Sequence, residues 1–151
     1  MPAPEVVVRG NVAGFTQEIN AGAHRFFSDE PKDLGGENAG PSPYELLAAA
    51  LGACTSMTIG MYARRERWPL ASVTVRLRHS KIHADDCANC ETKDAMLDRI
   101  DRDIELVGNL TREQREKLLE IADKCPVHRT LTRGMKISSR LVDAAESEPS
   151  E

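Results

Sequence analysis

The spacing of apolar residues predicts a chain that mixes short strands, long strands and helices. Residues 43–65 contain a run, Leu46 to Cys54, that is apolar on nearly every side of a helix. Such a helix is buried, through the middle of a domain or at a dimer contact. Residues 73–83 alternate, with Val73, Val75, Leu77, His79, Lys81 and His83 on one face, as in a long strand. A second long strand is expected up to Gly108, beginning near Ile100 and leaving 98–101 ambiguous.

Turn and capping signals divide the rest of the chain. Ser42 is a suitable N-cap for the long helix, and Thr111 with Gln114 forms a capping-box pattern that opens a helix to about Lys124. Pro126 is expected to interrupt the chain after that helix. The remaining expected strands lie at 6–9, 15–19, 24–28 and 135–142. Because helices and strands mix without regular βαβ units, the predicted class is α+β.

Length and composition fit one domain. The chain has 151 residues, of which 40% are hydrophobic, enough to build a core. No internal linker or repeat is visible, so we expect a single domain over 1–142. Residues 143–151 carry four acidic groups and no basic one, and we expect a solvated, disordered tail.

Charge and targeting signals exclude several function classes. The formal net charge is -4 and the acidic tail accounts for it, so the body is near neutral and offers no basic surface for nucleic acid. We expect no membrane partner, since no apolar run approaches the roughly 20 residues that cross a bilayer. The N-terminus lacks the features of a signal peptide. These observations predict a cytoplasmic protein.

The cysteines are the main candidates for chemistry, because disulfides are rare in the cytosol and metal binding or redox catalysis explains such residues better. Cys54 reads either as a small buried hydrophobe or as a reactive thiol that needs a cation from another segment. Cys125 reads either as a helix-terminal residue or as a second thiol able to meet Cys54. An imidazolium at His128 would tune the Cys125 thiol.

A second group of candidate ligands lies in a polar stretch of the chain. Cys87 and Cys90 form a Cys-x-x-Cys motif that follows His79 and His83. Four such ligands could close tetrahedrally on a structural zinc ion. Against this, the two histidines would lie about 13 Å apart on an extended strand, so both could bind only if the strand ended before His83. A lone Cys-x-x-Cys is also a common coincidence.

Three segments together carry a family resemblance. They are Gly40 to Leu47, Leu51 to Thr55 and Lys124 to Leu131, which holds Cys125-Pro126. With these segments the chain resembles the osmotically inducible protein C (OsmC) and organic hydroperoxide resistance (Ohr) family, over nearly its whole length. The resemblance implies a curved antiparallel sheet packed on a long buried central helix in an intertwined homodimer.

The resemblance also implies thiol peroxidase chemistry on organic or fatty-acid hydroperoxides, in defence against oxidative stress. Cys54 matches the peroxidatic cysteine and Cys125 the resolving cysteine. Attack by Cys54 would give a sulfenic acid and an alcohol, and Cys125 would then form a disulfide. A dithiol, typically lipoyl in this family, would reduce that disulfide. No cofactor is implied beyond the possible zinc.

The match is weaker at the residues that support the reactive thiol. The family uses an Arg and a Glu there, and many hydroperoxide-resistance members carry the Glu ten residues before the cysteine. Tyr44 occupies that position here and Glu45 lies nine before, an offset of roughly 100 degrees around a helix. Glu45 is nevertheless the candidate for the supporting Glu. The candidate for the supporting Arg is Arg9, because of its place in the order of elements, or else Arg25.

These departures place the chain nearer the less characterised OsmC-like branch and keep other functions open. One alternative is a non-enzymatic module with zinc at Cys87 and Cys90 plus a histidine. Another is a protein that keeps the fold and binds an apolar ligand in the interface pocket.

Overall fold

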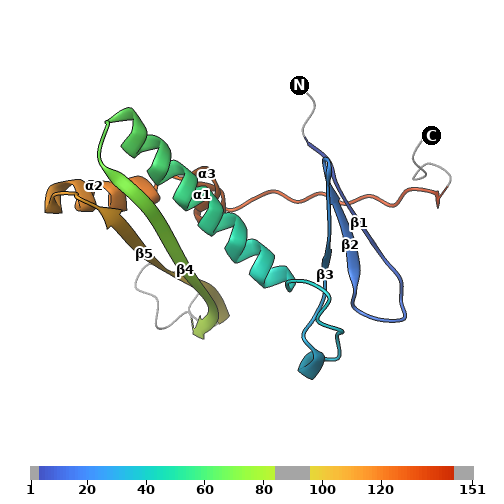
Figure 1. Cartoon of the computed structure of the whole chain (residues 1–151). Coiled ribbons are helices and arrows are strands. Elements are labelled where there is room, and N and C mark those ends of the chain that lie inside the picture. Colours follow the sequence, from blue (N-terminus) through green and yellow to red (C-terminus); the bar gives the residue numbers. More distant parts are fainter. Residues whose placement is uncertain (1–3, 84–95, 145–151) are drawn as a thin grey trace.

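The computed structural model describes residues 4–83 and 96–144. Its first part is an antiparallel sheet in the order β1-β2-β3, formed by β1 (Val6–Gly10), β2 (Gln17–Ala21) and β3 (His24–Ser28). The strands expected at 6–9 and 24–28 are confirmed, and the one expected at 15–19 begins two residues later. The sheet lies beyond the N-terminal end of the long helix (Figure 1).

A loop with a short 3-10 turn, η1 (Lys32–Leu34), leads from this sheet into helix α1 (Pro43–Arg65). Both bounds of α1 match the sequence prediction. The hydroxyl of Ser42 accepts the Glu45 N–H, the Glu45 carboxylate accepts the Ser42 N–H, and Pro43 occupies the first turn. This capping box fixes where the helix starts.

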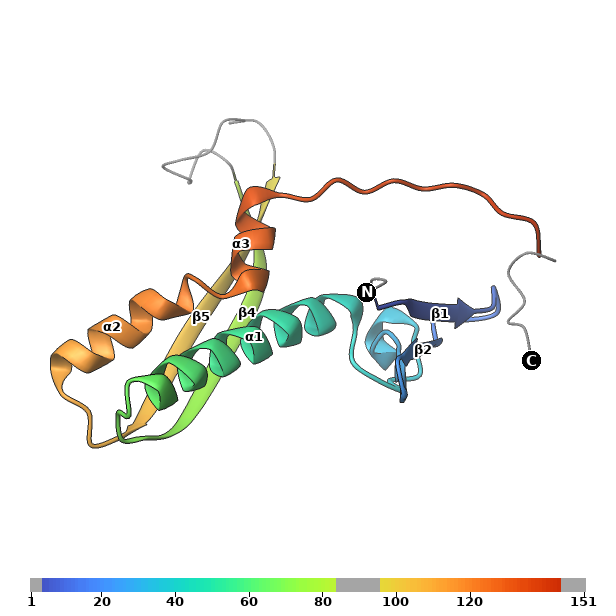
Figure 2. The same ribbon diagram turned by 90° about the horizontal axis from the view of Figure 1, so that it is seen from above.

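The second sheet runs along α1 (Figures 1 and 2). It pairs β4 (Leu70–His83) with β5 (Met96–Gly108) in antiparallel register, so both expected long strands are confirmed. Within β4, Val73, Val75, Leu77 and His79 are half-buried and the residues between them are exposed. The expected alternation ends after His79, because Lys81 is exposed and Ile82 is half-buried. Gly52 of α1 allows a close approach, because a Cβ there would lie 2.7 Å from Leu77 Cδ1.

Two further helices complete this part of the fold. α2 (Arg112–Ala122) starts at the expected capping box of Thr111 and Gln114. α3 (Pro126–Arg133) is an additional helix, because the sequence predicts only an interruption at Pro126. Proline is favoured at the first position of a helix, and Pro126 has that role here. The core joins two residues of α1 to two of α2, namely Ile59, Ala63, Leu118 and Ala122.

The strand expected at 135–142 is wrong for the single chain. These residues leave α3 as extended chain and pair with no strand among the described residues. Figure 2 shows the segment passing clear of the β1–β2–β3 sheet, which it overlaps in Figure 1. Apolar side chains along it are exposed, Ile137 by 82% and Leu141 by 99%.

The α+β class is confirmed, but the single chain buries α1 less than expected and divides its strands between two sheets. Only Leu51, Gly52, Thr55, Ile59 and Ala63 of α1 are buried. The opposite face is exposed and apolar, with Met57 72% and Met61 61% exposed. The sheet β4–β5 and the helices α2 and α3 cover one side of α1 and leave the other open.

The expectation that no segment is apolar enough for a bilayer is too strong at α1. By length and composition alone, this 23-residue helix is apolar enough to cross a membrane, since 18 consecutive residues have a mean hydropathy of 1.5. Only 28% of that stretch is buried inside the chain. The support for a membrane span is weak, because core helices of soluble proteins meet the same criteria.

Candidate functional site

The buried thiol of Cys125 lies where α1, β5 and the α2–α3 junction meet. Cys125 is the N-cap of α3, and its sulfur accepts a hydrogen bond from the backbone N–H of His128 at 3.2 Å. The sulfur therefore takes the place of the oxygen that usually caps a helix. The N–H donor and the positive end of the helix dipole both favour negative charge on this atom.

Thr55 of α1 brings this thiol next to the other candidate cysteine. Its Oγ1 lies 3.9 Å from the sulfur of Cys125, and Thr55 follows Cys54 directly in the helix. Cys54 is half-buried, and both thiols are free. The structure thus places Cys125 against the helical turn that carries Cys54, although the two residues are 71 positions apart in the sequence.

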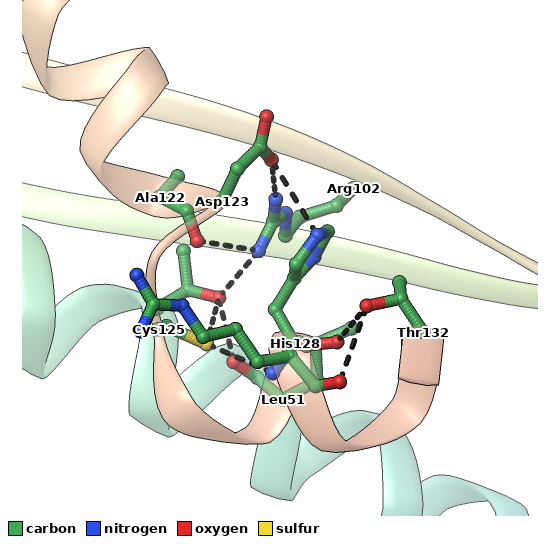
Figure 3. Close-up of polar contacts among 9 residues, drawn as sticks. Leu51, Arg102, Ala122, Asp123, Cys125, His128 and Thr132 are labelled. Carbon is green, nitrogen blue, oxygen red and sulfur yellow. Dashed lines mark hydrogen bonds and ion pairs between the residues drawn. The ribbon is translucent and has the colours of Figure 1, made fainter. Parts of the chain in front are cut away.

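Arg102 of β5 supplies a nearly buried positive charge to the same place, with its side chain 12% exposed. Its Nη1 donates to Thr55 Oγ1 at 2.9 Å and to the Ala122 carbonyl at 3.3 Å. Its Nη2 donates to Asp123 Oδ1 at 2.8 Å. Figure 3 shows the guanidinium between the end of α2 and the turn of α1 beside Cys125.

Asp123 connects Arg102 to His128. The same carboxylate oxygen that accepts from Arg102 lies 4.0 Å from His128 Nε2, an ion pair whenever the imidazole is protonated. Asp123 is largely exposed, whereas Arg102 is not. The charged end of this network thus faces solvent and the thiol end is buried.

Arg102 was not among the residues predicted for the site, although the sequence contained a signal. In β5, Arg102 shares a face with the half-buried Ile100, Ile104 and Leu106, and positions 103, 105 and 107 are exposed. A charged residue among inward positions of a strand needs a partner in the interior, which marks it as a candidate. The alternation does not show which groups it meets, because they come from α1 and from the end of α2.

Within one chain, the structure does not bring the two predicted arginines to the cysteines. Arg25 forms an ion pair with Glu18 across the first sheet, with Arg25 Nε 3.0 Å from Glu18 Oε1. The hydrogen bond from Arg25 lowers the pKa of Glu18, and the same bond raises the pKa of Arg25. Arg9 lines a cavity of about 380 Å³ on that sheet. Both stay predictions as thiolate partners, which would require a sheet from a second chain.

Glu45 is engaged in the capping box of α1, where its Oε1 accepts the Ser42 N–H at 3.1 Å. It lies nine residues before Cys54, about 13 Å along the helix axis. Its role beside the thiolate therefore stays a prediction. Tyr44, at the family's Glu position, stacks on the imidazole of His79 with ring centroids 4.2 Å apart.

A cavity of about 480 Å³ opens beside the site, lined by α1, β4, β5 and α3. On its polar wall His79 Nε2 lies 2.8 Å from Asp98 Oδ1. This hydrogen bond, helped by Lys81, lowers the pKa of Asp98. The apolar wall includes Leu47, Leu51 and Leu131.

The predicted zinc ligands are only partly covered by the structure. Cys87 and Cys90 lie outside the described residues, and so does the side chain of His83. β4 continues to His83, so the condition for both histidines to bind is not met, and the His79 imidazole is already used by Tyr44 and Asp98. No group of three candidate metal ligands occurs among the described residues. The zinc site stays a prediction.

The fold and the site define an α+β protein in which a thiol on α1 and a second thiol at the N-cap of α3 lie on either side of Thr55 in the contacts described above. A family described as OsmC-like protein matches residues 35–140, which include both candidate cysteines. The chain belongs to this family. The resemblance seen in the sequence is thereby confirmed. No curated protein gives a significant match to the chain.

Solved structures share the fold at low identity. An OsmC-like protein from Mycoplasma pneumoniae has a TM-score of 0.69 at 16% identity, covering 87% of this chain and 88% of that one. An organic hydroperoxide resistance protein OsmC from Legionella pneumophila has a TM-score of 0.61 at 21% identity, and the match covers 85% of this chain and 88% of that one. The organic hydroperoxide resistance protein OhrB of Bacillus subtilis has a TM-score of 0.60 at 21% identity, and the match covers 87% of this chain and 91% of that one.

Proposed function

We propose that the protein is a thiol-dependent peroxidase that reduces organic or fatty-acid hydroperoxides in a stress-related redox role, with Cys54 as the peroxidatic and Cys125 as the resolving cysteine. The observation that carries the proposal is the contact of the Cys125 thiol with Thr55, the neighbour of Cys54. Family membership and the hydroperoxide resistance proteins among its structural neighbours support the same chemistry.

The reaction takes place in three balanced steps. The Cys54 thiolate attacks the distal peroxide oxygen, the O–O bond breaks, and the alkoxide takes a proton to leave as an alcohol while Cys54 becomes a sulfenic acid. The Cys125 thiol then attacks the sulfenic sulfur, which forms the disulfide and releases water. A dithiol of the lipoyl type reduces the disulfide by two exchange steps and is itself oxidised. Such a cycle suits the reducing cytoplasm.

A homodimer is part of this proposal. The open face of α1, the extended segment after α3 and the first sheet all expose large apolar side chains, which a second chain would cover. They include Val6, Val8, Phe26, Phe27, Met57, Met61, Ile137 and Leu141. In such an assembly the first sheet of one chain can bring Arg9 or Arg25 toward Cys54 of the other.

The test is peroxide consumption with a reduced lipoyl donor, using cumene hydroperoxide and a fatty-acid hydroperoxide. Cys54→Ser should abolish turnover, because an alcohol is not a nucleophile for peroxide under these conditions. Cys125→Ser should leave one equivalent of peroxide consumed per chain and no further turnover. The control is Arg78→Met, which changes an exposed ion pair with Asp103 on β4–β5 and should turn over at the wild-type rate.

Consumption by Cys54→Ser at the wild-type rate would end the proposal. So would the absence of turnover in folded, fully reduced wild-type protein with either hydroperoxide.

A further inference from the structure

The proposed mechanism does not explain why a nearly buried cation lies so close to the resolving thiol. Arg102 reaches the site from β5, and its one acidic partner among the contacts described above, Asp123, lies at the solvent side. Its Nη1 is directed instead to a buried hydroxyl, that of Thr55. A buried charge is expensive to maintain, so a role for the Arg102–Thr55 contact is expected.

The hydrogens around the Thr55 hydroxyl can be assigned from its neighbours. Oγ1 accepts a hydrogen bond from Arg102 at 2.9 Å, and its single O–H donates to the Leu51 carbonyl at 2.6 Å. The oxygen has one lone pair left, and the Cys125 sulfur lies 3.9 Å away. While Cys125 is a thiol, its S–H can donate weakly to that lone pair. The sulfur meanwhile accepts the N–H of His128.

Loss of the thiol proton changes this arrangement. The sulfur becomes a strong acceptor, and the Thr55 O–H can rotate from the Leu51 carbonyl to the thiolate. The Arg102 hydrogen bond polarises that hydroxyl and makes it a better donor. The thiolate then accepts two hydrogen bonds, from Thr55 and from the His128 N–H.

We propose that Arg102 and Thr55 form a relay that stabilises the Cys125 thiolate, so that Arg102 is a positioning residue for disulfide formation. The inference rests on the proposed function, in which Cys125 is the second nucleophile. The thiolate attacks the sulfenic sulfur of Cys54, the S–S bond forms and the S–O bond breaks. The departing hydroxide takes up a proton, equal to the one the thiol lost, and leaves as water.

The test measures ionisation of the Cys125 thiol directly, through thiolate absorbance near 240 nm during a pH titration. The background is Cys54→Ser/Cys87→Ser/Cys90→Ser, so that Cys125 is the only thiol, and the same protein with Cys125→Ser is subtracted. The titratable and charged groups that face the network are Arg102 from β5, Asp123 after α2 and His128 from α3. His128→Gln is included because the His128 imidazole lies 4.0 Å from the same Asp123 oxygen that accepts from Arg102.

We expect Arg102→Met and Thr55→Val each to raise the midpoint of thiolate formation by about one pH unit, a tenfold loss of thiolate at a fixed pH below the midpoint. Thr55→Ser keeps the hydroxyl and should restore the wild-type midpoint. Arg102→Lys keeps the charge and should restore part of the shift. Arg78→Met is the matched control, because Arg78 pairs with Asp103 on the exposed side of the same sheet.

Two results would overturn the relay. In one, folded Arg102→Met titrates as the wild type does. In the other, Arg102→Met raises the midpoint but Thr55→Val does not, which would show that the charge acts without the hydroxyl. If Arg102→Met fails to fold, Thr55→Val still tests the relay, because valine is close to threonine in shape and the substitution removes no charge. The titration uses no peroxide, so it can succeed or fail independently of the peroxidase test.

A second readout follows the reaction itself. After one equivalent of hydroperoxide, a sulfenic-acid trapping reagent should capture severalfold more Cys54 in Arg102→Met than in the wild type, because the slower Cys125 leaves the sulfenic acid exposed for longer. Equal trapping in the two proteins would contradict the relay. No trapping in either protein, with the hydroperoxide left unconsumed, would contradict the proposed function instead.

Discussion

The carboxylate of Asp29 is the hydrogen-bond centre of the loop that leads into α1. Its oxygens accept from the Thr16 hydroxyl at 2.8 Å and from the backbone N–H groups of Glu30, Glu37 and Ala39. Burial by itself raises the pKa of Asp29, but these hydrogen bonds outweigh it and the net pKa lies below its usual range. The Asp29 carboxylate thus adds four hydrogen bonds to a loop that is also closed by backbone hydrogen bonds, such as Asp29 N–H to the Pro41 carbonyl.

This carboxylate should make stability depend on pH in acid. Because the folded pKa is lowered, the contribution of Asp29 is present above the unfolded pKa of about 4 and is lost as pH falls through the folded value. Asp29→Asn should lower the free energy of unfolding near pH 6, with the difference from wild type shrinking below about pH 4. Urea unfolding at several pH values measures this. Asp33→Asn, at an exposed position in η1, should follow the wild type throughout.

At the scale of elements, the start of α1 fixes the position of Cys54. The helix begins at the capping box of Ser42 and Glu45, and each turn after it places the next residues at a set angle. Thr55 faces Cys125 and the neighbouring Cys54 is half-buried as a result. A shift of one residue in the start would turn both side chains by roughly 100 degrees relative to β5 and α3.

Substitutions in the capping box of α1 should separate effects on folding stability from effects on peroxide turnover. Ser42→Ala should lower the free energy of unfolding by about 1 kcal/mol, since it removes the acceptor for the Glu45 N–H. Glu45→Gln keeps an oxygen for the Ser42 N–H, so thermal unfolding should stay near wild type. Loss of peroxide turnover in this stable variant would support the predicted role of the carboxylate beside the thiolate, and unchanged turnover would limit Glu45 to the cap.

At the scale of the whole molecule, large apolar side chains are exposed on several elements. The open face of α1 and the segment 135–142 expose Met57, Met61, Ile137 and Leu141. Soluble monomers rarely expose contiguous apolar patches of this kind, and closed symmetric dimers are the commonest way to cover them. The same dimer would complete the site if it brings the first sheet to Cys54.

We therefore expect a solution mass of twice the 16.6 kDa of one chain, measured by light scattering after gel filtration. Met57→Lys should shift the protein toward monomer, because it places a charge in the covered face. Glu113→Gln, an exposed position of α2, changes the net charge by the same amount and should leave the mass unchanged. A wild-type protein that stays monomeric at high micromolar concentration would exclude the dimer.

Local chemistry explains which parts of the fold could be predicted. The bounds of α1 follow from a cap, a proline and an apolar run, all within the segment itself. The strands β4 and β5 could likewise be predicted, because the alternation of inward and outward positions is visible in neighbouring residues. α3 was missed because Pro126 either interrupts a helix or begins one, and only the arrangement of the chain after Cys125 decides which. The segment 135–142 has a strand pattern, but pairing needs a neighbour at the right distance.

The sequence by itself determined the bounds of α1, the two long strands, the start of α2, the α+β class and the two cysteines of the proposed chemistry, because these depend on residue type and short-range spacing. Only the tertiary structure decided what surrounds the Cys125 sulfur. Thr55, Arg102 and His128 come from α1, β5 and α3, and no spacing in the sequence relates them. They meet because apolar packing of α1 against the sheet and α2 fixes three backbones at once, and the polar network forms where that packing leaves room for it.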